Sequence, residues 1–276
     1  MSTAQTLALG AIAGFTIFLG LPLGRMRNAD PRLRAGLCAV AAGVLLFLFF
    51  DVVKHGWGPV EEASEEHEWG ELAGYGLLFA GGILAGLMTL VYYDRWMMKQ
   101  RGRTLIGPGA ASVAEFERSW VARLTAGQWL ALLIATGIGV HNFAEGLAIG
   151  QESAAGDLSL ALALVIGFAL HNATEGFGIV GPMAGDERRP SWAYLLLLGV
   201  IGGGPTFVGT AIGYSWTNTW VEVAFLAVAA GSILYVIVEL FAVLRRFESK
   251  TLVTWAVLLG LFLGFATELV LEAAGA

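Results

Sequence analysis

Long apolar stretches recur along the chain and alternate with short polar segments. A helix needs about 20 apolar residues to cross roughly 30 Å of hydrocarbon, so each stretch predicts one transmembrane helix. The stretches cover approximately residues 5–23, 33–53, 72–93, 128–150, 158–182, 192–214, 220–244 and 251–271. The pattern therefore predicts an all-α, polytopic membrane protein with eight transmembrane helices in a single domain over residues 1–276.

Lysine and arginine are concentrated in the segments that follow the odd-numbered spans. These segments carry 15 of the 16 basic residues, and Lys54 is the exception. Because basic residues favour cytoplasmic loops, the odd-numbered loops are predicted to be cytoplasmic and both termini extracytoplasmic. The regular alternation also supports the count of eight spans, since a missed span would disturb it.

The composition excludes the class of soluble domains. Hydrophobic residues make up 57% of the chain and charged residues only 14%, whereas soluble domains carry about 25% charged residues. The single cysteine, Cys38, excludes a disulfide framework. We therefore expect the lipid bilayer as the surroundings, the cell membrane as the location, and no nucleic-acid partner.

Two of the polar segments have features of their own. The second, Lys54 to Glu71, is predicted to be an external loop in which six glutamates surround His55 and His67. Such a loop either attracts metal ions or is simply a solvated face. The third, about residues 94–127, is the longest, and Ala114 to Leu124 is expected to form a helix in the headgroup layer.

A repeated hexad of polar residues lies inside the fourth and fifth apolar stretches. His141-Asn142-Phe143-Ala144-Glu145-Gly146 is followed thirty positions later by His171-Asn172-Ala173-Thr174-Glu175-Gly176. In each hexad His and Glu are four residues apart and therefore share one helix face. Because the two predicted helices are antiparallel, we expect the hexads to face each other near mid-membrane, as in transporters built from inverted repeats.

These residue types point to a metal site. Imidazole nitrogens, amide oxygens and carboxylates are all ligands for divalent metals, and ionisable side chains inside a membrane indicate a functional site by default. The alternative is that they only hydrogen-bond neighbouring helices, but six such residues repeated in the same order favour the metal site. Zn²⁺ suits these donors, and Fe²⁺, Mn²⁺, Co²⁺ and Cd²⁺ are alternatives.

The hexads also resemble a known family. His141-Asn142-Phe143-Ala144-Glu145-Gly146-Leu147-Ala148 is similar to the fourth-span signature of the ZIP (Zrt-, Irt-like protein) divalent-metal transporters, and the second hexad is similar to their fifth-span motif. Eight spans with both termini outside is the topology of that family. The resemblance is to the prokaryotic type, because Glu175 stands where many eukaryotic members have His.

The resemblance implies a binuclear metal site and alternating-access transport of Zn²⁺ or related dications into the cytosol. It implies that the metal ligands are the six polar hexad residues and one carboxylate of the seventh span: His141, Asn142, Glu145, His171, Asn172, Glu175 and Glu239. The alternative for Glu239 is an interfacial carboxylate near Arg245 and Arg246. Two features depart from the family pattern. Ala144 and Thr174 replace prolines that commonly precede the motif glutamates, and the third loop contains no histidine.

Other residues are weaker candidates. Asp51, together with His55, is expected either to guide ions inward or to be an ordinary interface charge, and Glu268 is expected to be interfacial. Gly202-Gly203-Gly204-Pro205 is expected to interrupt the sixth span and to form a mobile or packing element beside the fourth and fifth spans.

These observations favour a metal transporter over two other classes of function. An intramembrane metal-dependent hydrolase is the main alternative, but the chain has no H-E-x-x-H motif and no evident base beyond the ligands. A metal sensor is disfavoured because we find no soluble output domain. We therefore expect no enzymatic activity and no cofactor other than the transported ion, and the glycine-rich helix surfaces would permit a homodimer.

Overall fold

The structure is a computed structural model that describes residues 2–26, 30–101, 124–156, 158–183, 189–215, 218–245, 247 and 249–273. The surface helix expected over residues 114–124 lies outside these ranges except for its last residue. Eight helical segments of the described chain are long and apolar enough to cross a membrane, which confirms the predicted fold class. The elements are α1 (Thr3–Phe15), η1 (Thr16–Leu19), η2 (Leu21–Arg25), α2 (Pro31–Glu65), α3 (Trp69–Arg101), α5 (Ala126–Ala155), α6 (Leu158–Val180), η4 (Gly181–Met183), α7 (Trp192–Gly213), α8 (Thr219–Leu244) and α9 (Lys250–Ala273).

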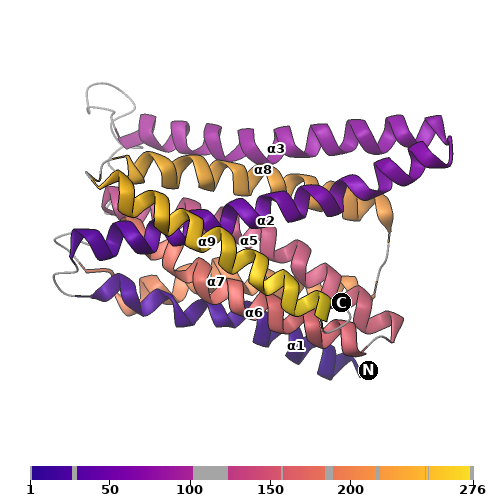
Figure 1. Cartoon of the computed structure of the whole chain (residues 1–276), viewed down its shortest axis with the longest axis horizontal. Helices are drawn as coiled ribbons and strands as arrows, with labels where there is room; N and C mark the ends of the chain where they lie inside the picture. Colours follow the sequence, from indigo (N-terminus) through magenta and orange to yellow (C-terminus); the bar gives the residue numbers. More distant parts are fainter. Residues whose placement is uncertain are drawn as a thin grey trace, which may run out of the picture.

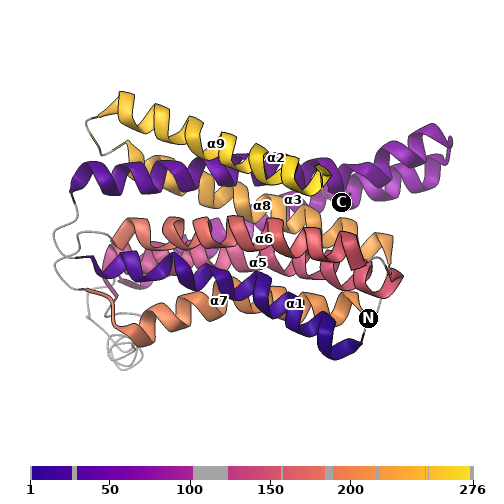
Figure 2. The same ribbon diagram turned by 60° about the horizontal axis from the view of Figure 1, so that its bottom comes forward.

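The helices are arranged in two layers (Figure 2). One layer contains α1, α5, α6 and α7, here called the α5 bundle, and the other contains α2, α3, α8 and α9, here called the α2 bundle. The layers meet where α5 packs on α8 and where α6 packs on α2 and α9. Both termini lie at the same end of the molecule (Figure 1), as the span count predicts.

Glycines bring helix backbones into direct contact within each bundle. A Cβ added to Gly146 of α5 would lie 2.1 Å from the carbonyl oxygen of Thr206 on α7. Glycines of the α2 bundle lie equally close to carbonyl oxygens of neighbouring helices: Gly43, Gly86, Gly231 and Gly260. Between the bundles the contacts involve side chains, since a Cβ on Gly137 of α5 would meet the side chain of Val236 on α8. The two bundles are thus interlocked internally and joined to each other through side chains.

The acidic segment after the second span is helical, so the expectation of a loop over residues 54–71 is wrong. α2 continues to Glu65 and α3 begins at Trp69, and this hairpin extends beyond the other helices (Figures 1 and 2). The end of an apolar stretch marks where a helix can leave the membrane, but glutamate is a good helix former, so the helix continues. His67 lies in the short turn with a φ of 61°.

The sixth span is unbroken, so the expected interruption at residues 202–205 is also wrong. α7 runs through this segment with Pro205 inside it. Proline has no N–H to bond the carbonyl group four residues earlier, which here belongs to Ile201. This carbonyl faces Gly139 of α5, because a Cβ added to Gly139 would lie 2.2 Å from its oxygen. The glycine-proline segment is therefore a packing element against the fourth span.

The first span is less regular than its apolar pattern suggests. Its α-helix ends at Phe15, and the chain continues as the 3₁₀ turns η1 and η2. Gly20, between these turns, lies directly against the second hexad, because its added Cβ would be 2.7 Å from the carbonyl oxygen of Ala173. The irregular end of the first span thus packs against the helix that carries His171.

Candidate metal centre

A tight turn makes α5 and α6, which carry the two hexads, antiparallel neighbours. α5 begins with a capping box in which the side chains of Thr125 and Gln128 each accept a hydrogen bond of 3.0 Å from the other's backbone N–H. It ends at Gly156, whose φ of 87° is a left-handed conformation that favours glycine. α6 begins two residues later, so the chain returns at once and places the second hexad beside the first.

Three side chains from the two hexads converge on one point. His141 Nε2 lies 3.0 Å from Glu145 Oε1, and His171 Nε2 pairs with the same carboxylate oxygen. The potential ligand atoms of the three residues lie within 4.8 Å of one another, and each residue is at most 5% exposed. Two imidazoles and a carboxylate in this arrangement are donors that could hold a divalent metal.

The surroundings of His141 fit a metal ligand better than a structural histidine. Its Nε2 is close to Glu145 but lacks the alignment of a hydrogen bond, and neither ring nitrogen has a hydrogen-bond partner. Buried polar groups are otherwise almost always hydrogen-bonded. The unpartnered ring nitrogens are compatible with a metal ion as the partner of this imidazole.

The remaining hexad residues connect the two helices around this trio. Asn142 Nδ2 donates to Glu175 Oε2, and Asn172 Nδ2 donates to Glu145 Oε2, both over 3.4 Å. Each asparagine therefore reaches the glutamate of the other hexad. Asn142 Oδ1, Asn172 Oδ1 and Glu175 Oε1 are buried without a hydrogen-bond partner, which leaves three oxygen atoms able to coordinate a cation.

Backbone carbonyl groups of α7 and α1 hold the two asparagines in place. Asn142 Nδ2 donates to the carbonyl oxygen of Gly202 at 2.9 Å, and Asn172 Nδ2 donates to that of Ala13 at 3.1 Å. Sequence reasoning did not find these partners, because a backbone carbonyl group carries no residue-type signal. The amide nitrogens thus have structural partners, while the amide oxygens stay available.

The cluster contains two buried carboxylates, Glu145 and Glu175. The ion pairs of Glu145 are with the imidazoles of His141 and His171, which are charged only when protonated. Burying carboxylates without a fixed counter-charge is strongly unfavourable. A dication bound between the hexads would balance both carboxylates, and neutral imidazoles with the amide oxygens would complete its ligands.

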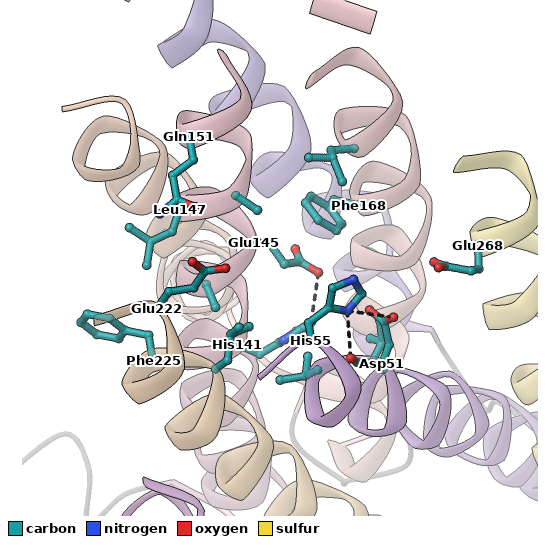
Figure 3. Close-up of a pocket in the computed structure, with 16 residues that line it drawn as sticks. Asp51, His55, His141, Glu145, Leu147, Gln151, Phe168, Glu222, Phe225 and Glu268 are labelled. Carbon is teal, nitrogen blue, oxygen red and sulfur yellow. Dashed lines mark hydrogen bonds and ion pairs between the residues drawn. The ribbon is translucent and has the colours of Figure 1, made fainter. Parts of the chain in front are cut away.

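A cavity of about 210 Å³ extends from this cluster toward the end of the molecule where both termini lie. His141 and Glu145 form part of its wall. Farther out the wall carries polar side chains from four helices (Figure 3): Asp51, His55, Gln151, Glu222 and Glu268. Asp51 and His55 form an ion pair over 3.3 Å. Nothing in the sequence indicated that Gln151 and Glu222 would lie in a cavity wall, because polar residues are common near the ends of membrane spans.

Glu239, which the resemblance implied as a ligand, lies away from the cluster. Ser232 of α8 donates to the carbonyl oxygen of Gly137 on α5 at 3.2 Å and fixes the relative position of the two helices. His141 follows Gly137 by four residues and Glu239 follows Ser232 by seven, and because α5 and α8 are antiparallel the two residues lie on opposite sides of this contact. At 1.5 Å per residue, they are roughly 16 Å apart along the helix axes. The metal-competent group found in the described chain consists of His141, Glu145 and His171, so a ligand role for Glu239 stays a prediction.

Comparison with known proteins agrees with this geometry. A search of curated proteins found no match. The model of the ZIP zinc transporter family matches residues 117–272, which is more than half of the chain and includes both hexads. With this match and an all-helical structure of eight membrane-spanning helices, the chain belongs to the ZIP zinc transporter family.

Proposed function

We propose that this protein carries divalent metal ions, with Zn²⁺ as the preferred cargo, through the cell membrane into the cytosol. Membership of the ZIP family points to divalent metal transport. The observation that supports the proposal most directly is the buried trio of His141, Glu145 and His171, of which two residues also line the cavity. A carrier needs this combination, because the ion must enter from one side and exchange its water for protein ligands at mid-membrane.

Two ions are proposed to bind side by side. The trio provides nitrogen and oxygen ligands for one ion. Asn142, Asn172 and Glu175 each have a buried oxygen without a hydrogen-bond partner, and these oxygens supply ligands for the second. The two carboxylates, one from each hexad, balance part of the charge that two dications bring.

The two-bundle architecture supports an alternating-access mechanism. The hexads lie on the α5 bundle, whose helices are interlocked by glycine-to-backbone contacts. The contacts with the α2 bundle are made by side chains, which can exchange neighbours when packed elements slide past each other. We therefore propose that the α5 bundle moves as a unit against the α2 bundle and carries the bound metal from one side to the other.

Metal uptake by reconstituted vesicles tests this function. His141→Ala and Glu175→Ala should reduce Zn²⁺ uptake by at least about tenfold, because each removes a ligand of the proposed site. His67→Ala is the matched control, because His67 lies in the turn of the α2–α3 hairpin and does not line the cavity. Uptake at the unmodified rate in both site variants would contradict the proposal. Flux without any added organic substrate separates a transporter from an intramembrane hydrolase, which would give none.

Competition between metals tests the proposed preference. Zn²⁺ uptake is measured with Fe²⁺, Mn²⁺, Co²⁺ or Cd²⁺ in excess, and the pH is varied on one side of the membrane. A site with two imidazoles should favour Zn²⁺ and Cd²⁺ over Mn²⁺, since nitrogen ligands bind the former more strongly. Equal competition by Mn²⁺ would contradict Zn²⁺ as the preferred cargo.

A further inference from the structure

Trp129 of α5 and Asp94 of α3 are hydrogen-bonded across the boundary between the two bundles. The indole Nε1 donates to Oδ1 of the carboxylate at 2.9 Å. Asp94 lies in a part of α3 that is apolar enough to span a membrane, where a carboxylate is unfavourable unless it has a partner. Both residues adjoin the segment after the third span, which the distribution of basic residues predicts to be cytoplasmic.

Packing holds the indole of Trp129 in a fixed position. The residue is only 5% exposed, and its ring centroid lies 5.7 Å from that of Tyr93 on α3. The hydroxyl of Tyr194 on α7 donates to the carbonyl oxygen of Gln128 at 2.6 Å, which ties this turn of α5 to its own bundle. Trp129 is therefore a firmly held part of the α5 bundle that reaches across to the α2 bundle.

The carboxylate of Asp94 lies in partly buried surroundings, which strengthen its hydrogen bond with Trp129. Its side chain is half-buried. Hydrogen bonds to ionised groups are roughly twice as strong as neutral ones, and a low dielectric strengthens them further. Asp94 and Trp129 are thus joined by one of the stronger kinds of polar contact between bundles.

This hydrogen bond lies at the opposite end of the interface from the cavity. Trp129 precedes His141 by 12 residues, which is roughly 18 Å along α5. The cavity leaves His141 in the other direction, toward Gln151. Trp129 belongs to a continuous core of buried apolar side chains that also contains Leu133 of α5 and Leu240 and Leu244 of α8. In the part of the chain that the structure describes, the cavity therefore reaches the candidate metal site from the end that carries the termini, and buried apolar side chains pack at the other end.

We infer that Asp94 and Trp129 form a latch that keeps the cytoplasmic side of the interface closed while the metal site is open to the outside. The inference rests on the proposed function, in which the two bundles alternate. Metal can leave toward the cytosol only when the bundles part at this end, and Trp129 must then leave Asp94. The two residues act by positioning the bundles and do not touch the metal. Loss of the latch should raise the inward-open population about tenfold, the effect of one hydrogen bond to a charged group.

Cysteine accessibility tests the latch without requiring transport. Cys38 is the only cysteine of the chain and is replaced by alanine, and Leu133→Cys then places a reporter one turn from Trp129 at a position that is 1% exposed. A membrane-impermeant maleimide is added to vesicles whose cytoplasmic face is outside, and the labelling rate is measured without metal. Trp129→Phe keeps an aromatic ring but loses the N–H, so it should increase this rate about tenfold.

Three further variants identify the interaction itself. Asp94→Ala should increase labelling as much as Trp129→Phe, and the double variant should increase it no more than either alone, because all remove one shared interaction. Asp94→Asn keeps an uncharged acceptor and should give an intermediate rate. Tyr194→Phe is the matched control, since it removes a hydrogen bond at the same level but inside one bundle; its rate should equal that of the reporter protein.

Each outcome decides the inference. Unchanged labelling in both Trp129→Phe and Asp94→Ala, or an equal increase in Tyr194→Phe, overturns the latch. If Trp129→Phe fails to fold, the two Asp94 variants still test the latch. An unchanged labelling rate in both Asp94→Asn and Asp94→Ala would overturn it. If the unmodified protein takes up metal but the latch variants do not change the labelling rate, only the latch is overturned. If the unmodified protein takes up no metal, the proposed function is overturned.

Discussion

Asn142 on α5 donates a hydrogen bond of 2.9 Å to the carbonyl oxygen of Gly202 on α7. The same amide nitrogen donates to Glu175 on α6, so both of its N–H groups have acceptors and one side chain joins three helices. Its oxygen is buried without a partner. The nitrogen of this amide therefore connects the helices, while its oxygen stays available as a ligand for the proposed cation.

Asn142→Asp should separate the structural role of this residue from its role as a ligand. Aspartate has the same shape but no N–H, so the carbonyl of Gly202 would lose its donor and a second carboxylate would stand beside Glu175. Without metal, we expect the free energy of unfolding to fall by about 3 kcal/mol. With Zn²⁺, the added carboxylate is a stronger ligand than an amide, so the Zn²⁺-induced rise in Tm should exceed that of the unmodified protein. Thermal unfolding with and without Zn²⁺ measures both effects.

The matched control for this prediction is Asn218→Asp. Asn218 is the N-cap of α8 and accepts from the backbone N–H of Val221 at 3.2 Å, and aspartate caps a helix equally well. This variant should therefore leave both the metal-free Tm and the Zn²⁺-induced shift unchanged. Equal metal-free stability of Asn142→Asp and the unmodified protein would show that the two donated hydrogen bonds are not structurally important.

Gly146→Ala should destabilise the protein through the contact between α5 and α7. The new Cβ would lie 2.1 Å from the carbonyl oxygen of Thr206, so the helices must move apart at an expected cost of at least about 1–3 kcal/mol. Gly204→Ala on α7 is the control, because its new Cβ would meet nothing closer than 3.8 Å and alanine favours a helix by about 1 kcal/mol. Thermal unfolding in detergent compares the two, and equal Tm values would contradict the close packing.

The membrane spans and the clustering of His141, Glu145 and His171 were predictable from the sequence. Apolar length alone identified the spans, because crossing a bilayer imposes a fixed minimum of apolar residues. His141 and Glu145 are four residues apart, and the histidine and glutamate of the second hexad have the same spacing. This spacing places the two side chains of each hexad on one face of their helix. Antiparallel neighbours then brought these faces together, so the trio with His171 follows from periodicity and topology.

The structural details around the site were not predictable in the same way. The carbonyl groups of Gly202 and Ala13 are partners through backbone position, which residue type does not reveal. The helical extension of α2 to Glu65 was missed because hydropathy marks the membrane boundary and not the helix end. Glu239 was assigned by resemblance to a sequence position, whereas its placement along α8 depends on how that helix is registered against α5 through Ser232.

Metal binding should weaken as the pH falls. In the proposed site, His141 and His171 would bind metal as neutral imidazoles, and the ordinary pKa of histidine is about 6.5. Below that range protons compete with the metal, so the apparent Kd for Zn²⁺ should increase, by up to about tenfold per pH unit for each protonated imidazole. Titration in detergent between about pH 7.5 and 5.5 measures the slope. His141→Gln should reduce the slope by about one proton, and a Kd that does not change with pH would exclude these imidazoles as ligands.

Glu222 should attract metal ions toward the site without binding them there. It lies in the first turn of α8 and lines the cavity that leads to the hexads, where a carboxylate raises the local concentration of dications. Glu222→Gln should therefore raise the KM of metal uptake a few-fold at low ionic strength and leave kcat unchanged. The difference should shrink at about 0.5 M salt, since salt screens charges. Glu71→Gln, on the exposed hairpin and outside the cavity lining, is the matched control and should leave KM unchanged. A fall in kcat at constant KM would contradict this role, because it would show that Glu222 acts on the bound ion and not on its approach.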